Sequence, residues 1–153
     1  MRTAIVTHPL DPAALLAEVS QERNGAALLF VGTVREVNDG RPVMGIEYSA
    51  YAPMAERELQ AIVHEAAERF GTEDIVVEHR LGRLGLKDAS VVIAVAHPHR
   101  GEAYEASRYI IEQLKRRVPI WKREEYVDGT REWVAANNQE AGSREQDAVE
   151  ASS

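Results

Sequence analysis

An unbroken apolar run, "ASVVIAVAHP" at residues 89–98, lies in the middle of this chain of 153 residues. It is too short to cross a bilayer, which takes about 20 residues in a helix. It also lacks the alternation of a half-exposed strand, so it is typical of a central β-strand that is covered on both faces. The run therefore predicts the middle strand of a sheet, in a chain long enough for one domain with a substantial core.

Strand-like and helix-like segments alternate along the rest of the chain. In the clearest helical segment, Ala55, Leu59 and Ile62 belong to one apolar stripe, and Gly71 supplies a left-handed stop. A loop is expected at "VNDGRP" (37–42) because it is rich in turn residues. Helices are expected at about 12–21, 53–70 and 101–116, and further strands at 3–8, 25–36, 43–51 and 74–85.

The predicted fold class is α+β. Short links between neighbouring segments favour hairpins, and Asp128-Gly129 between two extended segments is a strong hairpin signal. We therefore expect a mainly antiparallel sheet with about three helices on one face and a small C-terminal β-subdomain or hairpin. The predicted domain covers 1–134. The acidic segment 135–153 contains too few large apolar residues to order itself, so it is expected to be a disordered tail.

Composition excludes several kinds of site. The chain has no cysteine, which excludes disulfides, thiolate metal sites and cysteine nucleophiles, so any sulfur it handles must arrive on another molecule. A net charge of -7 argues against general nucleic-acid binding, whereas a local basic pocket on an acidic body suits a small anion. No signal-peptide pattern or membrane-length apolar run is present, so the cytoplasm is the expected location.

Positive charge is concentrated in "LKRRVPIWKREEY" (114–126). Lys115 lies in the last turn of the third expected helix, where the helix dipole favours cations. The dipole does not explain Lys122, because that residue lies beyond the end of the helix. Pro119 stops the helix, so the chain turns and the two lysines can converge on one volume. Trp121 and Ile120 are expected to form an apolar wall there. Like charges close to a lysine disfavour its protonated form, so both lysines are candidates for proton transfer or nucleophilic attack.

Two further segments are candidate anion sites. "AHPHRGE" (96–102) passes from the central strand to a helix N-terminus, where unpaired N–H groups favour an anion beside His99 and Arg100. Alternatively, these are ordinary solvated side chains. The H-x-H spacing has no evident third ligand, so no metal is predicted. Arg35 directly follows a buried strand, a position that favours a ligand site but also suits a plain surface charge.

The motifs "FVGTVRE" and "AHPHRGEAYEASRYIIEQLKRRVPIWKREEY", with the spacing between them, resemble the large, catalytic subunit of molybdopterin synthase, the MoaE family. The resemblance runs from about residue 3 to 134 and leaves out the acidic tail. It implies an α/β hammerhead-like fold with an added β-subdomain. It also implies a sulfurtransferase that needs no cofactor and converts cyclic pyranopterin monophosphate to molybdopterin. The implied sulfur donor is the C-terminal Gly-Gly thiocarboxylate of a small ubiquitin-like subunit, which fits a chain without cysteine.

Roles for single residues follow from this resemblance by matching motif positions. Lys115 and Lys122 match the two catalytic lysines, and the implied assembly is a central homodimer of large subunits with a small subunit at each end, a heterotetramer. Five further positions are implied to bind substrate: Arg35, His99, Arg100, Arg123 and Glu124.

A different class of function remains open on the residues alone. The basic cluster could belong to a non-catalytic adaptor that only receives a partner's acidic tail. Charge alone would then be sufficient, so Lys→Arg changes at 115 and 122 would preserve function. An enzyme would lose activity, because arginine does not release its proton in the relevant pH range. An RNA-binding protein needs a broad basic face or exposed stacking aromatic residues, and a net charge of -7 with two tryptophans and five tyrosines offers little of either.

Overall fold

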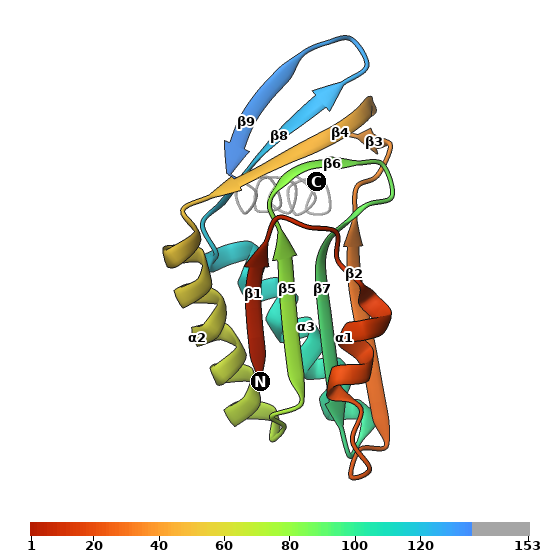
Figure 1. The fold of residues 1–153 in the computed structure, drawn as a ribbon, viewed down its shortest axis with the longest axis vertical. Helices are drawn as coiled ribbons and strands as arrows, with labels where there is room; N and C mark the ends of the chain where they lie inside the picture. The colour runs from red at the N-terminus through yellow and green to blue at the C-terminus, as the bar shows by residue number, and fades with distance from the viewer. Residues whose placement is uncertain (136–153) are drawn as a thin grey trace, which may run out of the picture.

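The structure, a computed structural model, describes residues 1–135, and its elements form two sheets and three helices (Figure 1). The first sheet has the order β1-β5-β7-β2. β1 runs parallel to β5, and the other neighbours are antiparallel. These strands span β1 (Arg2–Val6), β2 (Ala26–Thr33), β5 (Ile75–Arg80) and β7 (Ala89–His97). The apolar run at 89–98 is therefore an inner strand, as predicted.

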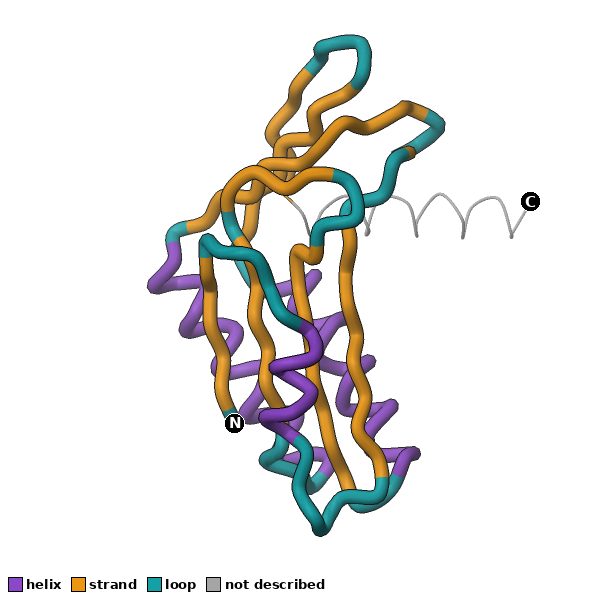
Figure 2. Tube along the Cα trace, turned by 45° about the vertical axis from the view of Figure 1, so that its right-hand side comes forward, coloured by secondary structure: helices purple, strands orange, loops and turns teal. Residues whose placement is uncertain are grey.

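Helices cover both faces of this sheet (Figure 2). The three are α1 (Pro12–Val19), α2 (Ala52–Phe70) and α3 (Arg100–Arg117). Val91, Ile93 and Val95 of β7 belong to the large core with α2 and α3, whereas Val92 and Ala94 belong to a smaller core under α1. The expectation of helices on one face only is therefore wrong. β7 is apolar at every position, so each of its faces needs a covering element.

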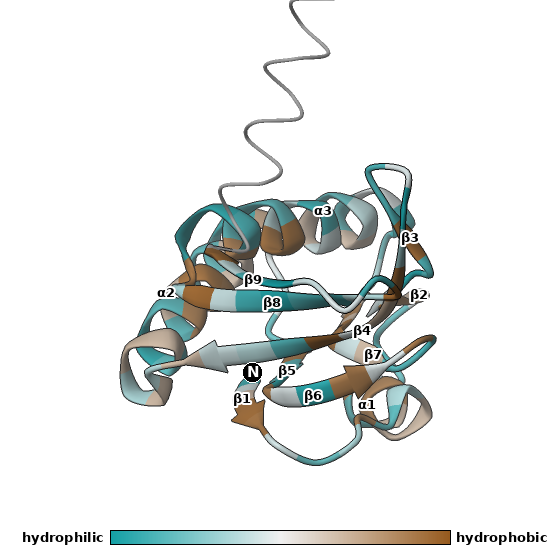
Figure 3. Ribbon diagram, turned by 90° about the horizontal axis from the view of Figure 1, so that it is seen from above, coloured by the Kyte–Doolittle hydropathy of each residue, from teal (hydrophilic) through white to brown (hydrophobic). Residues whose placement is uncertain are grey.

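A second sheet crosses the end of the first (Figure 3). It follows the order β3-β4-β8-β9, with β6 paired to β4. Its strands are β3 (Val37–Asn38), β4 (Arg41–Ala50), β6 (Gly82–Gly85), β8 (Ile120–Tyr126) and β9 (Arg131–Ala135). β8 and β9 form the predicted C-terminal hairpin, in which Gly129 has φ 86°. The predicted α+β class, with three helices and a small β-subdomain, is confirmed.

Residues 37–42, expected to be a loop, instead form a tight hairpin of β3 and the start of β4. Asn38 pairs with Arg41, and the two residues between them, Asp39 and Gly40, have φ 50° and 77°. Two consecutive positive φ values are the geometry of a type I′ turn, which matches the twist of the strands that it joins. Of the acidic tail expected at 135–153, Ala135 is the last residue of β9, and residues 136–153 lie outside the described part of the chain.

Local signals end α2 and α3, and the end of α3 sets the geometry of the site. α2 ends at Gly71, whose φ of 73° is the left-handed conformation that glycine adopts without strain. α3 ends at Val118, directly before Pro119. The chain then turns at once into β8, so the last turn of α3 and the first residues of β8 lie close together. No helix within residues 1–135 is long and apolar enough to cross a membrane.

Candidate functional site

A cavity of about 250 Å³ lies where the two sheets meet the C-terminal end of α3. Its cationic lining comes from three separate places: Arg35 after β2, Lys115 in the last turn of α3, and Lys122 in β8. The remaining lining residues are Phe30, Gly32, Thr33, Asn38, Val43, Ile46, Tyr48, Ser90, Val91 and Glu124.

The predicted convergence of Lys115 and Lys122 is confirmed, because both line this cavity. α3 cannot continue through Pro119, and β8 leaves the bend antiparallel to β4. The lysines therefore face one volume from two different elements, instead of following one another along a single helix. Only 17% of the Lys122 side chain is exposed, so its amine is held largely away from solvent.

Successive residues of β8 point to opposite faces of the second sheet. Lys122 and Glu124 line the cavity, and Trp121 and Arg123 do not. The Trp121 side chain is half exposed, so the expectation that it forms a wall of the site is wrong. Arg123 forms an ion pair with Glu47, and its guanidinium lies 5.0 Å from the Trp133 ring centroid. In one chain, therefore, the structure does not bring Arg123 to the lysines.

Glu124 is the most enclosed charged group of the cavity, with 4% of its side chain exposed. Its Oε1 lies 3.2 Å from the Lys122 ammonium. Its Oε2 accepts a 2.6 Å hydrogen bond from the Asn38 amide and another from the Tyr126 hydroxyl. Burial alone would raise the pKa of this carboxyl, but the Tyr126 and Asn38 hydrogen bonds and the Lys122 charge outweigh it and hold the pKa below its ordinary value. Glu124 is therefore an anion that orients Lys122.

A buried imidazole packs against Tyr48, a residue that lines the cavity. His79 of β5 packs edge-to-face on the Tyr48 ring, at 5.2 Å between centroids, and its Nδ1 lies 3.0 Å from the Arg80 carbonyl oxygen. Burial, assisted by the positive charge of Lys115, lowers the pKa of His79 to about 4. The imidazole is therefore neutral at physiological pH. No sequence signal marked Tyr48 or His79, because each looks like an ordinary residue of a β-strand.

His99 and Arg100 lie at the other end of α3, beside a separate hollow of about 410 Å³ that Gly25, Pro98 and Gly101 also line. Lys115 lies 15 positions after Arg100 on the same helix, or about 22 Å away at 1.5 Å per residue. Within one chain, the structure does not bring the predicted substrate pair to the two lysines. Next to them, His97 fixes the start of α3, because its Nδ1 accepts a 2.8 Å hydrogen bond from the His99 N–H.

The apolar wall of the cavity comes from β2, β4 and β7, through Phe30, Val43, Ile46 and Val91. Gly32 lies between them, and a Cβ at this position would come within 2.7 Å of the Val91 side chain. These contributions escaped sequence analysis because they come from strands far apart in the chain. Asn38 also escaped, although its neighbours Asp39-Gly40 are a standard hairpin signal that could have located it.

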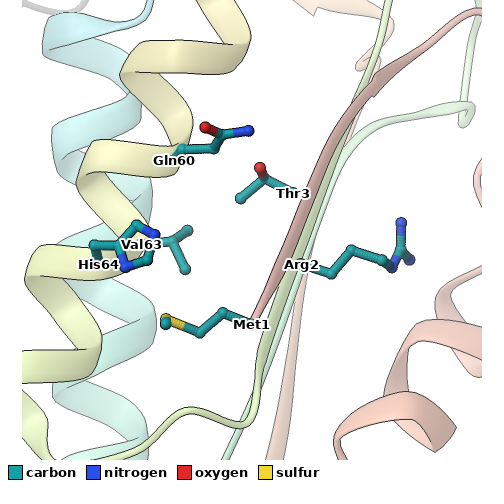
Figure 4. Close-up of a pocket in the computed structure, with 6 residues that line it drawn as sticks. All are labelled: Met1, Arg2, Thr3, Gln60, Val63 and His64. Atoms are coloured by element: carbon teal, nitrogen blue, oxygen red, sulfur yellow. The ribbon is translucent and has the colours of Figure 1, made fainter.

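A third hollow lies between β1 and α2 and is lined by Met1, Arg2, Thr3, Gln60, Val63 and His64 (Figure 4). The Arg2 side chain points away from the other lining residues and forms ion pairs with Glu18 and Glu78. This hollow therefore lacks the converging cations of the α3 cavity. Among residues 1–135, no group of three or more His, Cys, Asp or Glu side chains could hold a metal ion.

The fold and the cavity define a class of protein: an α+β domain that presents two amines and a guanidinium to an anionic ligand beside an apolar wall. Such a site can hold an anion, stabilise a developing negative charge and transfer protons. A model of the MoaE protein family matches residues 5–117. The chain belongs to the MoaE family.

Named relatives and solved structures agree with this assignment. The molybdopterin synthase catalytic subunit of Emericella nidulans is 44% identical over 126 residues, which cover 82% of this chain but only 65% of that protein. The subunit of the same name from Halalkalibacterium halodurans is 44% identical over 133 residues, covering 87% of this chain and 85% of that protein. The crystal structure of molybdopterin synthase from Staphylococcus aureus has a TM-score of 0.80 at 39% identity, covering 86% of this chain and 95% of that one.

A solved protein–protein complex of subunits 1 and 2 of the molybdopterin-converting factor from Helicobacter pylori contains a chain of the same fold. That chain has a TM-score of 0.69 at 24% identity, with 86% of this chain and 89% of that one covered. At this identity, the similarity concerns the fold.

Proposed function

We propose that this protein is the catalytic subunit of a molybdopterin synthase. It transfers two sulfurs from the C-terminal thiocarboxylate of a small ubiquitin-like subunit to cyclic pyranopterin monophosphate, forming the dithiolene of molybdopterin. The observation that carries the proposal is that Lys115 and Lys122 line one enclosed cavity from two different elements, with Arg35 beside them. The family of the chain and the names of its relatives point to the same reaction.

In this reaction the cavity cations have distinct tasks. Arg35 binds the cyclic phosphate or the negatively charged end of the donor tail, because its guanidinium can contact two oxygens at once. The thiocarboxylate sulfur attacks a side-chain carbon of the pyranopterin, the carbon–oxygen bond at that carbon breaks, and Lys115 or Lys122 donates a proton to the departing oxygen. The new carbon–sulfur bond leaves the small subunit attached as a thioester, which water then cleaves, so that the sulfur stays on the pyranopterin and the small subunit leaves as a carboxylate. A second loaded subunit repeats the transfer at the adjacent carbon, with opening of the cyclic phosphate.

The two ammonium groups also stabilise the oxyanions that form during attack on the thioester. Charges that are already in place in a cavity with few waters can contribute several kcal/mol to such a step. Glu124 holds Lys122 in position through the 3.2 Å ion pair. We propose this supporting role for Glu124 in addition to contact with substrate.

The small sulfur-carrier subunit is part of the proposal. The chain contains no cysteine, so the transferred sulfur must come from another molecule. In Helicobacter pylori, subunits 1 and 2 of the converting factor form a complex. A cavity of about 250 Å³ that is apolar on one side and cationic on the other suits a slender Gly-Gly tail ending in an anion. The reaction is proposed to take place in the cytoplasm, and fractionation of cells with an antibody against the chain tests this location.

A second copy of the chain can supply the distant substrate pair. β2 forms one edge of the first sheet, and its consecutive apolar residues Leu29, Phe30 and Val31 are each more than a third exposed. An exposed apolar edge strand favours pairing with another strand. Two copies related by a two-fold axis at this edge would pair their β2 strands antiparallel. A two-fold axis perpendicular to a strand places the copied strand beside it in the opposite direction.

Antiparallel pairing of this kind sets opposite ends of the two β2 strands side by side. One end of β2 leads to Arg35 and the lysine cavity, while Ala26 at the other end pairs with His97, close to His99 and Arg100. Each cavity would then receive His99 and Arg100 from the partner copy. We therefore propose a homodimer at the centre of a heterotetramer, with each cavity completed by both copies.

The test of the proposed function is a reconstituted reaction. Purified protein is mixed with a thiocarboxylated small subunit and cyclic pyranopterin monophosphate, and mass spectrometry measures a product with two added sulfurs. Lys115→Ala is expected to abolish this product, and Lys122→Ala to lower its rate by about 100-fold or more, as for loss of a general acid or base. Arg116→Ala is the matched control, because Arg116 is an exposed cation of the same helical turn that does not line the cavity.

The adaptor function makes a different prediction for conservative variants. Lys115→Arg and Lys122→Arg keep the charge but lose the exchangeable proton. An enzyme is expected to lose most of its turnover while still binding the small subunit, and calorimetry measures that binding. Normal turnover in both arginine variants, or in Lys115→Ala, would contradict the catalytic proposal.

A further inference from the structure

Asn38 links Arg35 and Glu124, two residues of the cavity that come from separate elements. Its side-chain oxygen accepts a 3.3 Å hydrogen bond from Arg35, and its side-chain nitrogen donates a 2.6 Å hydrogen bond to Glu124 Oε2, 86 residues away in the sequence. Glu124 Oε1 in turn contacts the Lys122 ammonium. One amide thereby connects the guanidinium that is proposed to bind the anion with the carboxylate that orients a proposed catalytic amine.

The backbone holds Asn38 in this place. The type I′ turn at Asp39 and Gly40 sets the register Asn38–Arg41, which brings Asn38 to the cavity beside β8. The base of the hairpin is fastened by a 2.7 Å hydrogen bond from the Val43 N–H to the Glu36 carbonyl. The amide is thus supplied by a short, well-defined hairpin and not by a loose connection.

We propose that Asn38 is a positioning residue of the sulfur-transfer site, which holds the Glu124 carboxylate in the orientation that directs the Lys122 amine into the cavity. This inference rests on the proposed function. Asn38 itself acts through Glu124 and Arg35.

The chemistry of the contact requires an amide. A carboxamide donates and accepts at the same time, so it can serve a carboxylate on one side and a guanidinium on the other. Aspartate would still accept from Arg35, but it has no proton for Glu124 and would place a second negative charge against it. Alanine removes both contacts, and Oε2 then keeps its hydrogen bond from the Tyr126 hydroxyl.

Because Glu124 is buried, the loss of one donor matters more than it would at the surface. Hydrogen bonds to charged groups are stronger than those between neutral groups, and a buried acceptor without its donor also bears its desolvation cost. The carboxylate is then free to rotate about its remaining contacts, and the Lys122 ammonium follows it. Such a change affects the chemical step more than the binding of substrate.

The variants are Asn38→Asp, Asn38→Ala and the control Asp39→Asn. Asp39→Asn exchanges a carboxylate and an amide of nearly equal size, as Asn38→Asp does, and it lies on the same hairpin. Asparagine tolerates the positive φ of 50° there. The control residue does not line the cavity. In the reconstituted reaction, Asn38→Asp and Asn38→Ala are expected to lower kcat about 10- to 100-fold, with KM changed about threefold or less, while Asp39→Asn keeps both values.

A second readout needs no substrate. Carbon-13 NMR of labelled glutamate side chains follows the titration of the Glu124 carboxyl in each purified protein. Its midpoint is expected to rise by about one pH unit in Asn38→Ala, because a hydrogen bond that favours the charged form is gone. Asp39→Asn is expected to leave the midpoint unchanged.

The outcomes separate the two proposals. Wild-type kcat in Asn38→Asp, or an equal loss in Asp39→Asn, would overturn the positioning role, and so would an unchanged Glu124 midpoint in Asn38→Ala. If the wild-type protein transfers no sulfur at all, the proposed function fails. The NMR titration would then still decide whether Asn38 controls Glu124.

Discussion

Single residues in this protein acquire their roles from the face on which a strand places them. Lys122 and Glu124 of β8 enter the cavity, while their neighbours Trp121 and Arg123 lie on the opposite face of the second sheet. His79 shows the same dependence on position. It is 3% exposed and packs against Tyr48, which lines the cavity. A residue that would titrate near pH 6.5 in solution is thereby kept neutral.

His79 is expected to make stability depend on pH. Its pKa is about 4 in the folded protein, so between that value and about 6.5 the unfolded chain binds more protons than the folded one. The free energy of unfolding therefore rises with pH across this window, by up to about 3 kcal/mol from this residue. His79→Phe, which keeps a ring against Tyr48, is expected to flatten the rise.

Urea unfolding followed by circular dichroism between pH 5 and 6.5 measures this effect. The exposed His8 supplies the control, and His8→Ala is expected to keep the wild-type slope. The lower limit of pH 5 keeps the measurement above the ordinary pKa of glutamate, so the ion-paired carboxylates do not contribute. A slope in His79→Phe equal to that of the wild type would show that the buried imidazole is not its source.

At the level of elements, β4 holds the second sheet together. It pairs with β3, β6 and β8, and its residues Ile46 and Tyr48 line the cavity. β6 approaches β4 very closely at Gly45, where an added Cβ would meet the Leu84 carbonyl oxygen at 2.8 Å. Because backbone cannot move aside as a flexible side chain does, this contact depends on glycine.

Gly45→Ala is therefore expected to destabilise the protein by about 1–3 kcal/mol, the usual cost of overpacking. Gly101 in the first turn of α3 gives a matched contrast, because a Cβ there meets no atom within 4 Å. Gly101→Ala is expected to raise stability by up to about 1 kcal/mol through its higher helix propensity. Thermal unfolding of both variants measures the difference, and a stable Gly45→Ala protein would mean that β6 can shift without cost.

At the level of the whole molecule, one cavity needs all of the side chains that are proposed to bind its substrate. A single chain holds Lys115 and Arg100 at opposite ends of α3, about 22 Å apart. The apolar edge of β2 offers a route by which a second copy brings them together. In such a dimer, each cavity takes its lysines from one copy and its His99–Arg100 pair from the other.

Mixing two inactive variants tests this arrangement. Lys115→Ala and Arg100→Ala are each expected to be inactive alone. After the two are dissociated and mixed in equal amounts, about half of the dimers contain one copy of each, and one of the two cavities in such a dimer is intact. About a quarter of wild-type sulfur transfer is therefore expected. If Arg100 acts within its own chain, no cavity is intact and the mixture stays inactive.

The β2 contact itself is tested by Leu29→Lys, which places a charge on the exposed edge. Size-exclusion chromatography with light scattering is expected to show a shift from dimer to monomer. A variant that remains dimeric would place the contact between copies elsewhere on the molecule.

Several features followed from the sequence because their causes are local. The apolar run at 89–98 is a central strand because it has no polar alternation, and α2 follows a stripe of spacing three and four. The bend at Pro119 predicted that Lys115 and Lys122 share one volume, because a helix does not continue through a proline beyond its first turn. The separation of Arg100 from Lys115 could also have been derived, since helix length alone sets it.

Other features depended on the tertiary structure. Trp121 and Lys122 are adjacent in a strand, so only one of them can face the cavity, and the packing of β8 on β4 decides which. The same packing brings the Asn38 amide to Glu124, although the two residues are 86 positions apart in the sequence. Helix stripes and prolyl bends are set by residues a few positions apart, so they can be derived from the amino-acid order. Cavities are set by contacts between distant strands, whose relative positions only the burial of a shared core decides.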